Sequence, residues 1–271
     1  MTASSEPLLR AADLSVTYGH RGRAAAPAVH DVSFSVRQGE TVGLVGESGS
    51  GKSSIAKAVL GLIRPSSGSI HFGERDITNP SRKMRRALAH ELQVVFQDPF
   101  SSLNPARTVG SSLIEPLLVG RSMSVKVAQE RARSTLSRVG LPVDAMSRFP
   151  ANFSGGQRQR IAIARALVME PKLIVCDEPV SALDLSIQAQ VLNLLIELQH
   201  RDDLSYLFIS HDLSVVRYLA HQVLVLQRGE IVEQGPGEKV WNAPQHPYTQ
   251  ALIASVPKLD PSARQPSAVQ K

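Results

Sequence analysis

The stretch that decides the fold is Gly46-Glu-Ser-Gly-Ser-Gly-Lys-Ser53, a complete phosphate-binding loop. The residues before it, Thr41–Val45, are typical of a short buried strand, and Ser54–Leu62 after it carry apolar side chains at helical spacing. A strand, a glycine-rich loop and a helix in this order let backbone N–H groups and the helix N-terminus surround a phosphate. The loop therefore predicts that the chain binds a nucleoside triphosphate.

Individual residues of this loop have different predicted roles. The ammonium group of Lys52 can reach the β- and γ-phosphates, and the hydroxyl group of Ser53 can bind Mg²⁺. The predicted nucleotide-binding set comprises Gly46, Glu47, Ser48, Gly49, Ser50, Gly51, Lys52, Ser53 and Ser54.

A second motif, Lys172-Leu-Ile-Val-Cys-Asp-Glu178, is an apolar run that ends in two acids. A buried strand of this kind brings a carboxylate to the Mg²⁺ beside a phosphate loop, which predicts Asp177 as a metal ligand. Glu178 follows at the strand end, in a position to polarise an attacking water as general base. Taken alone, the two acids could equally well do no more than end a strand before Pro179.

A third motif, Ser154-Gly-Gly-Gln157, opens a predicted helix over Ile161–Val168 and forms a second N-terminal anion site. We expect its hydroxyl group and free backbone N–H groups to face outward. One phosphate does not need two such sites in one chain. Two chains that face each other head to tail would use both, with each γ-phosphate between the loop of one chain and the helix of the other.

With these motifs the chain resembles the ATP-binding-cassette (ABC) ATPases, whose signature is the Ser-Gly-Gly-Gln run. Phe153 stands where the family usually has Leu, which is a conservative difference. The resemblance covers nearly the whole chain and implies hydrolysis of ATP with Mg²⁺. It also implies an α/β fold, namely a P-loop nucleotide-binding domain of the ABC type with an antiparallel β subdomain and a helical subdomain that ends in the signature.

The resemblance implies roles for further residues. Tyr18 matches the aromatic residue that stacks on adenine, although without the family it would be an ordinary strand aromatic. Gln97 matches the glutamine that contacts Mg²⁺ and the attacking water and responds to the membrane partner. Asp184 closes Ser181-Ala-Leu-Asp184, the loop that crosses the dimer interface, and His211 matches the histidine that contacts the γ-phosphate and orients the water.

The order of strand and helix patterns predicts the organisation of the chain. Leu14–Tyr18 and Val32–Val36 alternate apolar and polar residues, which indicates antiparallel strands. Residues 98–160 favour helices, with breaks expected at Pro105, Pro116, residues 140–142 and Pro150. Strands then alternate with helices, which predicts a parallel sheet. We expect an ATPase domain over residues 1–257 and a loose tail over 258–271.

Composition limits the function classes. The chain has 271 residues and a net charge of +6, which could indicate a nucleic-acid partner. Its basic residues are spread over helices without interleaved aromatics, which fits a solvated face near an anionic membrane surface at least as well, and we expect no nucleic-acid partner. It contains no apolar run of about 18 residues, and its N-terminus does not have the pattern of a signal sequence. Because Cys176 is the single cysteine, the chain has no disulfide framework, which fits a reducing cytosol. Cys176 itself is predicted in a buried strand.

Two segments, Gln97–Pro105 and His246–Leu252, look like those of oligopeptide/dipeptide importer ATPases. By their chemistry alone, the residues of His246–Leu252 favour a packing role. The resemblance implies two integral membrane permeases, a second ABC ATPase (this chain or a related one), an indirect solute-binding protein, and a peripheral location on the cytoplasmic face of the membrane. The alternatives are the same ATPase role in import of nickel or a metal chelate and, as a minor one, a soluble ABC ATPase linked to nucleic acid.

Overall fold

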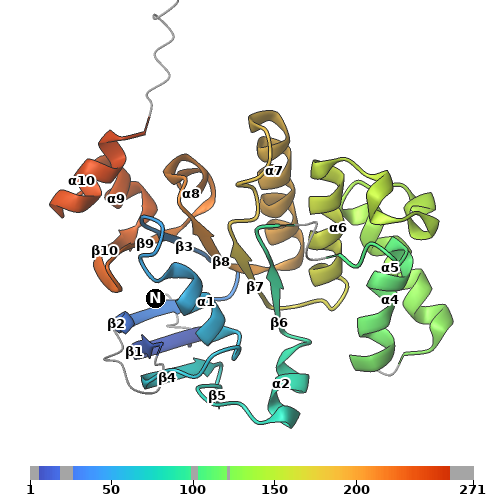
Figure 1. Ribbon diagram of the computed structural model, residues 1–271, viewed down its shortest axis with the longest axis horizontal. Coiled ribbons are helices and arrows are strands. Elements are labelled where there is room, and N and C mark those ends of the chain that lie inside the picture. Colours follow the sequence, from blue (N-terminus) through green and yellow to red (C-terminus); the bar gives the residue numbers. More distant parts are fainter. Residues whose placement is uncertain (1–5, 19–26, 99–102, 121–122, 257–271) are drawn as a thin grey trace, which may run out of the picture.

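The computed structural model describes residues 6–18, 27–98, 103–120 and 123–256, and it contains two sheets (Figure 1). One is antiparallel, with the strand order β2-β1-β4-β5. Its strands are β1 (Leu9–Thr17), β2 (Pro27–Val36), β4 (Ser67–Phe72) and β5 (Arg75–Asp76). The predicted antiparallel strands are therefore confirmed. Both strands begin earlier than expected, because β1 already pairs from Leu9, with β2 on one side and β4 on the other, and β-bulges interrupt this pairing further along.

The second sheet has the order β10-β9-β3-β8-β7-β6. Its strands are β3 (Thr41–Val45), β6 (Leu92–Val95), β7 (Leu173–Asp177), β8 (Ser205–Ser210), β9 (Gln222–Gln227) and β10 (Glu230–Pro236). All neighbours pair in parallel except β10, which is antiparallel to β9. Every residue of β3 and β8 is buried, as expected for parallel strands covered on both faces. This confirms the predicted parallel sheet.

The two faces of the parallel sheet belong to different hydrophobic clusters. Along β8, Tyr206 and Phe208 pack into one cluster with helices α6 (Gly155–Leu167), α7 (Leu185–Asp202) and α8 (Leu213–Leu219). Leu207 and Ile209 pack into the other cluster with the antiparallel sheet and α1 (Lys52–Val59). Successive side chains of a strand point to opposite faces, so one apolar strand serves both clusters. Cys176 of β7 is buried in the first cluster, as predicted.

The helical subdomain lies to one side of the sheets in Figure 1. It contains α4 (Val109–Gly120), α5 (Val125–Arg138), the 3₁₀ turns η1 (Val143–Ser147) and η2 (Pro150–Asn152), and α6 (Gly155–Leu167). The prediction that Pro116 breaks a helix is wrong, because it lies inside α4. Leu113 and Leu117 on either side of it are fully buried, and this packing outweighs the hydrogen bond that the proline removes.

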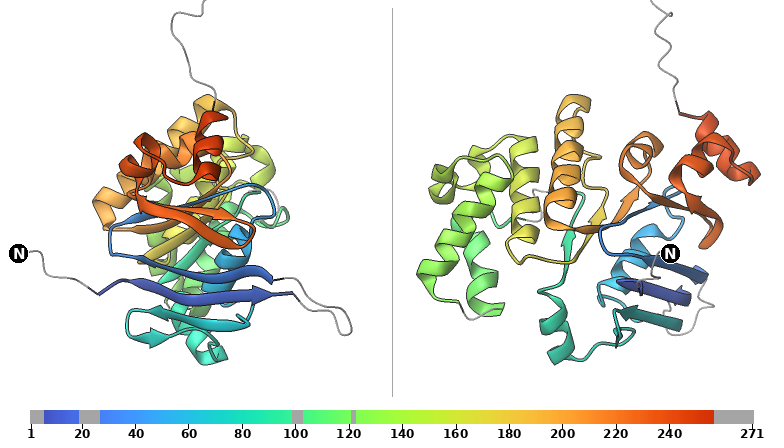
Figure 2. Two further views of the ribbon diagram at one scale, coloured as in Figure 1. Left: turned by 90° about the vertical axis from the view of Figure 1, so that its left-hand side faces the viewer. Right: turned by 180° about the vertical axis from the view of Figure 1, so that it is seen from behind.

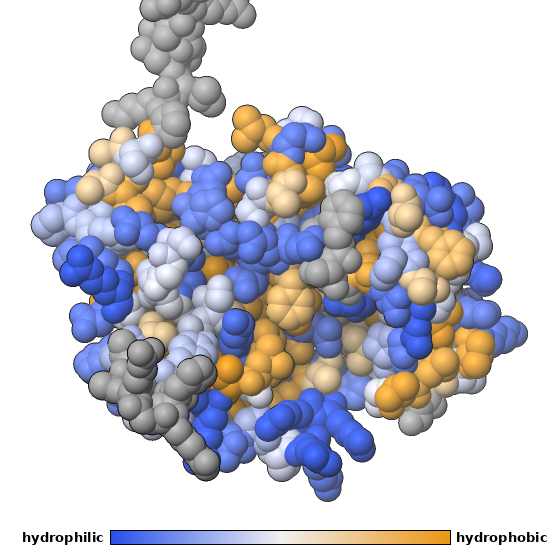
Figure 3. Space-filling view, viewed as in Figure 1, coloured by the Kyte–Doolittle hydropathy of each residue, from blue (hydrophilic) through white to orange (hydrophobic). Residues whose placement is uncertain are grey.

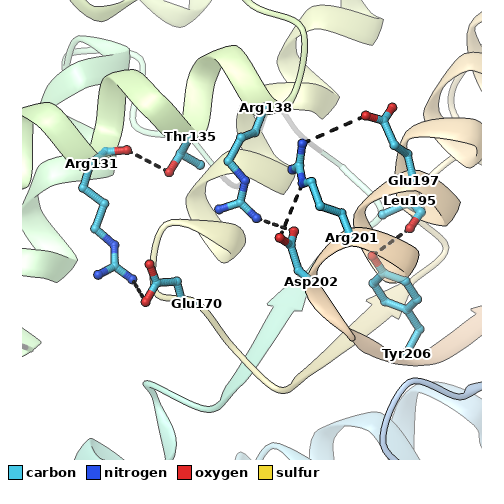
Figure 4. A network of polar contacts seen from close by, with 9 residues as sticks. All are labelled: Arg131, Thr135, Arg138, Glu170, Leu195, Glu197, Arg201, Asp202 and Tyr206. Carbon is cyan, nitrogen blue, oxygen red and sulfur yellow. Dashed lines mark hydrogen bonds and ion pairs between the residues drawn. The ribbon is translucent and has the colours of Figure 1, made fainter.

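Polar contacts join the helical subdomain to the rest of the chain (Figure 4). Arg138 of α5 forms an ion pair with Asp202 at the end of α7 (Leu185–Asp202). Two turns earlier, Arg131 lies 2.6 Å from the Glu170 carboxylate. It also donates to the carbonyl oxygen of Val168, and both partners lie in the connection from α6 to β7. Helix α5 is thus attached at the end of the parallel sheet opposite the phosphate loop.

The remaining helices are α1 (Lys52–Val59), α2 (Arg82–Leu88), α8 (Leu213–Leu219), α9 (Gly237–Asn242) and α10 (Pro247–Ala254). Figure 2 shows α9 and α10 beside the β9–β10 hairpin and away from the helical subdomain. Within the described ranges, no helix is both long and apolar enough to cross a bilayer. The predicted tail at 258–271 and the loop between the first two strands at 19–26 lie outside the described residues.

Candidate nucleotide-binding site

The site lies where the parallel strands end. Register pairs Val45 of β3 with Ser210 of β8, Ile209 of β8 with Asp177 of β7, and Cys176 of β7 with Val95 of β6. The residues that follow these strands therefore meet along one edge, which is where open α/β sheets place their ligands. Gly46, Glu178, Gln97 and His211 all come from these strand ends.

The glycines of the phosphate loop allow close backbone packing. A Cβ atom on Gly46 would lie 2.1 Å from the carbonyl oxygen of Leu226, and one on Gly51 would lie 2.3 Å from that of Ala28. Both residues also have positive φ angles, 152° and 108°, which disfavour any other residue. The loop is consequently held against the start of β2 and the end of β9, and it leaves a cleft of about 170 Å³ in front.

The loop and the start of α1 are suited to a phosphate. Gly51 is the N-cap of α1, and within the described chain no side chain caps its first turn, so backbone N–H groups there remain open to an anion. Lys52 is buried, and its ammonium group donates to the carbonyl oxygens of Gly46 and Glu47, both at 2.7 Å. Burial lowers the pKa of Lys52, and the nearby carboxylates of Glu178, Asp177 and Glu47 oppose that change.

The side chains of Ser53 and Asp177 are hydrogen-bonded to each other beside the phosphate loop. The Ser53 hydroxyl donates to Oδ1 of Asp177 at 3.3 Å. Burial and the neighbouring charge of Glu178 raise the pKa of Asp177. The hydrogen bond that Asp177 accepts from Ser53 and the positive charges of Lys57 and Lys52 oppose that change. A hydroxyl and a desolvated carboxylate are oxygen ligands that suit Mg²⁺, and a divalent cation would offset the cost of the buried charge.

Two side chains from the ends of neighbouring strands contact the carboxylate of Glu178. Nε2 of Gln97 donates to Oε2 of Glu178 at 3.1 Å, and Nδ1 of His211 lies 3.0 Å from the same oxygen. Glu178 itself has a φ angle of 50°, and its N–H group donates to the carbonyl oxygen of Ile209. A non-glycine residue in this region is strained, and such strain concentrates at functional sites. The three predicted catalytic residues thus form one cluster.

Tyr18 lies at the margin of the cleft. Its hydroxyl group donates to Oγ of Ser54 in the first turn of α1 at 3.1 Å, and the residue is 51% exposed. An exposed ring anchored beside the phosphate loop can stack on a base, and the contact with adenine stays a prediction.

The predicted signature residues are elsewhere in the fold. Ser154 caps α6 through a capping box, in which its hydroxyl accepts from the N–H group of Gln157 and the Gln157 side chain accepts from that of Ser154. The hydroxyl of Ser154 thus serves as the helix N-cap, and the residue is exposed. Its contact with an anion stays a prediction. A Cβ atom on Gly156 would lie 2.4 Å from the side chain of Ile187, so this glycine is needed for packing against α7.

Asp184 is the N-cap of α7 and accepts from the N–H group of Ile187 at 3.0 Å, and the loop before it places Leu183 next to Gly155. The signature and the Ser181–Asp184 loop therefore adjoin each other. In the part of the chain that the structure describes, no hydrogen bond or ion pair links either of them to the phosphate loop, and β7 and β8 separate α6 from α1 in Figure 1.

Sequence reasoning missed one contact of the loop. The hydroxyl group of Tyr248 accepts a hydrogen bond from the N–H group of Glu47 at 3.1 Å. The chemistry of His246–Leu252 favours packing, and no local pattern in the sequence indicates a partner 201 residues away.

Asp177→Asn should stabilise the metal-free, nucleotide-free protein by about 0.5–1 kcal/mol at neutral pH, as relief of a buried site charge commonly does. Because the pKa of Asp177 is raised in the native state, its contribution to stability falls as the pH rises through that pKa. The gain should therefore vanish in acid. Urea unfolding at a series of pH values, in the presence of a metal chelator, measures this gain in the free energy of unfolding. Asp144→Asn is the control, because Asp144 is exposed. A loss of stability at neutral pH would contradict the argument.

The phosphate loop, the strand-borne Asp177 and the Glu178 cluster on one parallel sheet define a nucleoside triphosphatase of the P-loop class. Comparison with known proteins specifies it further. A family model described as ABC transporter matches residues 29–181, and one described as oligopeptide/dipeptide transporter, C-terminal region, matches residues 232–271. The chain belongs to the ABC transporter ATPase family, and it is an ATPase.

Relatives and solved structures agree. The dipeptide transport ATP-binding protein of Escherichia coli (strain K12) is 44% identical over 264 residues, which covers 96% of this chain and 79% of that protein. A Brucella abortus (strain 2308) ATP-binding protein named for peptide import is 50% identical over 258 residues, 95% of this chain and 81% of that protein. A dimeric ATP-binding cassette bound to ADP and phosphate is 27% identical with a TM-score of 0.75, covering 84% of this chain and 98% of that one.

Proposed function

We propose that this chain is the ATP-hydrolysing subunit of a membrane importer for di- and oligopeptides. The match of residues 232–271 to the oligopeptide/dipeptide transporter region and the relatives named for dipeptide and peptide import support this cargo class. The ATPase itself does not contact cargo, so the cargo assignment depends on this family relation.

The single observation that carries the catalytic proposal is the convergence of Gln97 and His211 on the Glu178 carboxylate. In this proposal Glu178 accepts the proton of the attacking water, while Gln97 and His211 hold the carboxylate and the water in line. Glu178 is largely shielded from solvent, with 19% of its side chain exposed, whereas His211 is 56% exposed and therefore accessible to a phosphate that enters the cleft.

The proposed nucleotide is ATP with Mg²⁺. Lys52 would turn from its own loop carbonyls to the β- and γ-phosphates, and the N–H groups of Gly49, Gly51 and the start of α1 would bind the remaining phosphate oxygens. Ser53, Asp177 and Gln97 would hold Mg²⁺, which neutralises phosphate charge when bound. Tyr18 would stack on adenine.

The proposed working unit is a dimer of ATPase subunits. The cleft of about 170 Å³ is smaller than the roughly 300–1,000 Å³ of typical ligand pockets, which suggests that one wall is missing. Ser154 and Gln157 are exposed, Gly155 is partly exposed and Gly156 is buried behind them. They lie in another region of the chain, so we propose that they complete the site of a second subunit. Asp184 next to them would cross the interface. The dimeric form of the similar solved cassette supports this arrangement.

The proposed membrane partners are two permeases that bind the ATPase on the cytoplasmic face, with a solute-binding protein acting through them. Apolar side chains are exposed on the helical subdomain, seen in orange at the right of Figure 3. The exposed large apolar residues of this subdomain are Val119, Val125, Val127, Val143 and Phe149. Val119 also lines a groove of about 640 Å³, together with Gln93, Arg107 and Glu115. A permease segment with apolar and polar residues would fit this face.

The cargo is tested in cells. Loss of the gene should abolish growth on di- or oligopeptides as the source of a required amino acid, and it should leave nickel-dependent enzyme activity unchanged. Restoring the wild-type gene should restore growth, whereas a Glu178→Gln copy should not, because transport needs hydrolysis. Normal growth on peptides together with lost nickel-dependent activity would instead assign metal import, with the ATPase mechanism unchanged.

A further inference from the structure

The C-terminal part of the described chain reaches the phosphate loop. Helix α10 follows α9, which comes directly after β10, the edge strand of the six-stranded sheet (Figure 1). From its first turn, the hydroxyl group of Tyr248 accepts a hydrogen bond from the N–H group of Glu47 at 3.1 Å. Tyr248 belongs to the segment that matches the oligopeptide/dipeptide transporter region, outside the residues that match the ABC transporter model.

Tyr248 is held firmly enough to position its partner. The Glu233 carboxylate of β10 accepts from the N–H groups of Gln245 and His246 at 2.9 and 3.0 Å. Nδ1 of His246 then accepts from the N–H group of Tyr248 at 3.2 Å and caps α10. The Tyr248 ring also packs against the hydrophobic cluster that contains Tyr206 and Phe208. The hydroxyl group is therefore presented from a fixed backbone rather than from a free side chain.

On the loop side, the same peptide units are held from two directions. Tyr248 holds the N–H group of Glu47, while Lys52 donates to the carbonyl oxygens of Gly46 and Glu47. If Lys52 turns toward a phosphate, those carbonyls lose that donor, and Tyr248 remains as an anchor of the loop. A loop that must direct several N–H groups at one anion binds best when its backbone is already ordered.

We propose that Tyr248 is a positioning residue of the phosphate loop, through which the C-terminal region keeps residues 46–49 in the conformation that binds nucleotide. This inference rests on the proposed ATP site. It adds a contact by which movement of the C-terminal region changes nucleotide affinity without any residue of that region contacting ATP.

The test compares Tyr248→Phe with Tyr218→Phe. Both substitutions remove one hydroxyl group from a partly exposed tyrosine, and that of Tyr218 donates to Asn193 on α7. In the nucleotide-free protein, Tyr248→Phe should speed amide hydrogen exchange of the peptide covering residues 46–53, with the melting temperature within about 2 °C of wild type. Its dissociation constant for Mg-ATP should rise about two- to tenfold, the range for one hydrogen bond. Tyr218→Phe should change neither quantity.

The expected kinetic signature is a raised KM for ATP with kcat nearly unchanged, because the chemistry at Glu178 is not altered. Wild-type exchange and affinity in Tyr248→Phe would overturn the inference, and so would faster exchange throughout the protein with a lowered melting temperature, which indicates a structural role only. Failure of the wild-type protein to bind Mg-ATP would refute the proposed function instead, and the exchange comparison in nucleotide-free protein would still decide the role of Tyr248.

Discussion

The Glu178→Gln protein should release phosphate from ATP at least about 100-fold more slowly than wild type, the scale of loss of a general base. The amide cannot accept a proton from water, but its oxygen can still accept the hydrogen bond from Gln97 that the carboxylate accepts now. Nucleotide binding should therefore persist. Phosphate release measured with a coupled assay, together with equilibrium binding of ATP, separates the two effects.

A matched control removes a carboxylate of the same type away from the cleft. Glu197→Gln alters an exposed residue whose partner is Arg201 at 4.0 Å, and it should leave the rate unchanged. Because hydrolysis is blocked and binding is not, Glu178→Gln should also accumulate as a dimer in Mg-ATP if the chain pairs with itself. Phosphate release at the wild-type rate would show that another group activates the water.

Lys52→Met should weaken ATP binding by about 10- to 100-fold, since a hydrogen bond to a charged group contributes about 1.5–3 kcal/mol. Methionine keeps an unbranched apolar stem in the buried position, but it lacks the ammonium group that now donates to Gly46 and Glu47. The expected effect is on affinity first, because without this cation the β- and γ-phosphate charges have no buried positive partner in the loop.

Fluorescent-nucleotide titration measures this affinity, and the thermal shift caused by saturating Mg-ATP provides an independent reading. Lys83→Met on α2 is the control, because that lysine is exposed on a helix remote in sequence from the loop. An unchanged dissociation constant in Lys52→Met would mean that the loop binds phosphate through its backbone alone.

Much of the fold follows from local sequence. The phosphate loop, β7 and the start of α6 are each defined by neighbouring residues: glycines that permit positive φ angles, an apolar run, and a Ser/Gln capping box. Pro116 shows the limit of such reasoning, because the burial of Leu113 and Leu117 maintains a helix that local propensity would end.

Local sequence signals predicted which chemical groups are present and which elements carry them, because loop, strand and cap signals depend on residues only a few positions apart. The packing of distant segments is what brings Gln97 and His211 to Glu178, Gly156 against Ile187, and Tyr248 to Glu47. These contacts depend on strand order, register and helix packing across dozens to hundreds of residues. Such long-range pairings leave no periodic trace in a single sequence, because any of many residues could occupy each end of the contact.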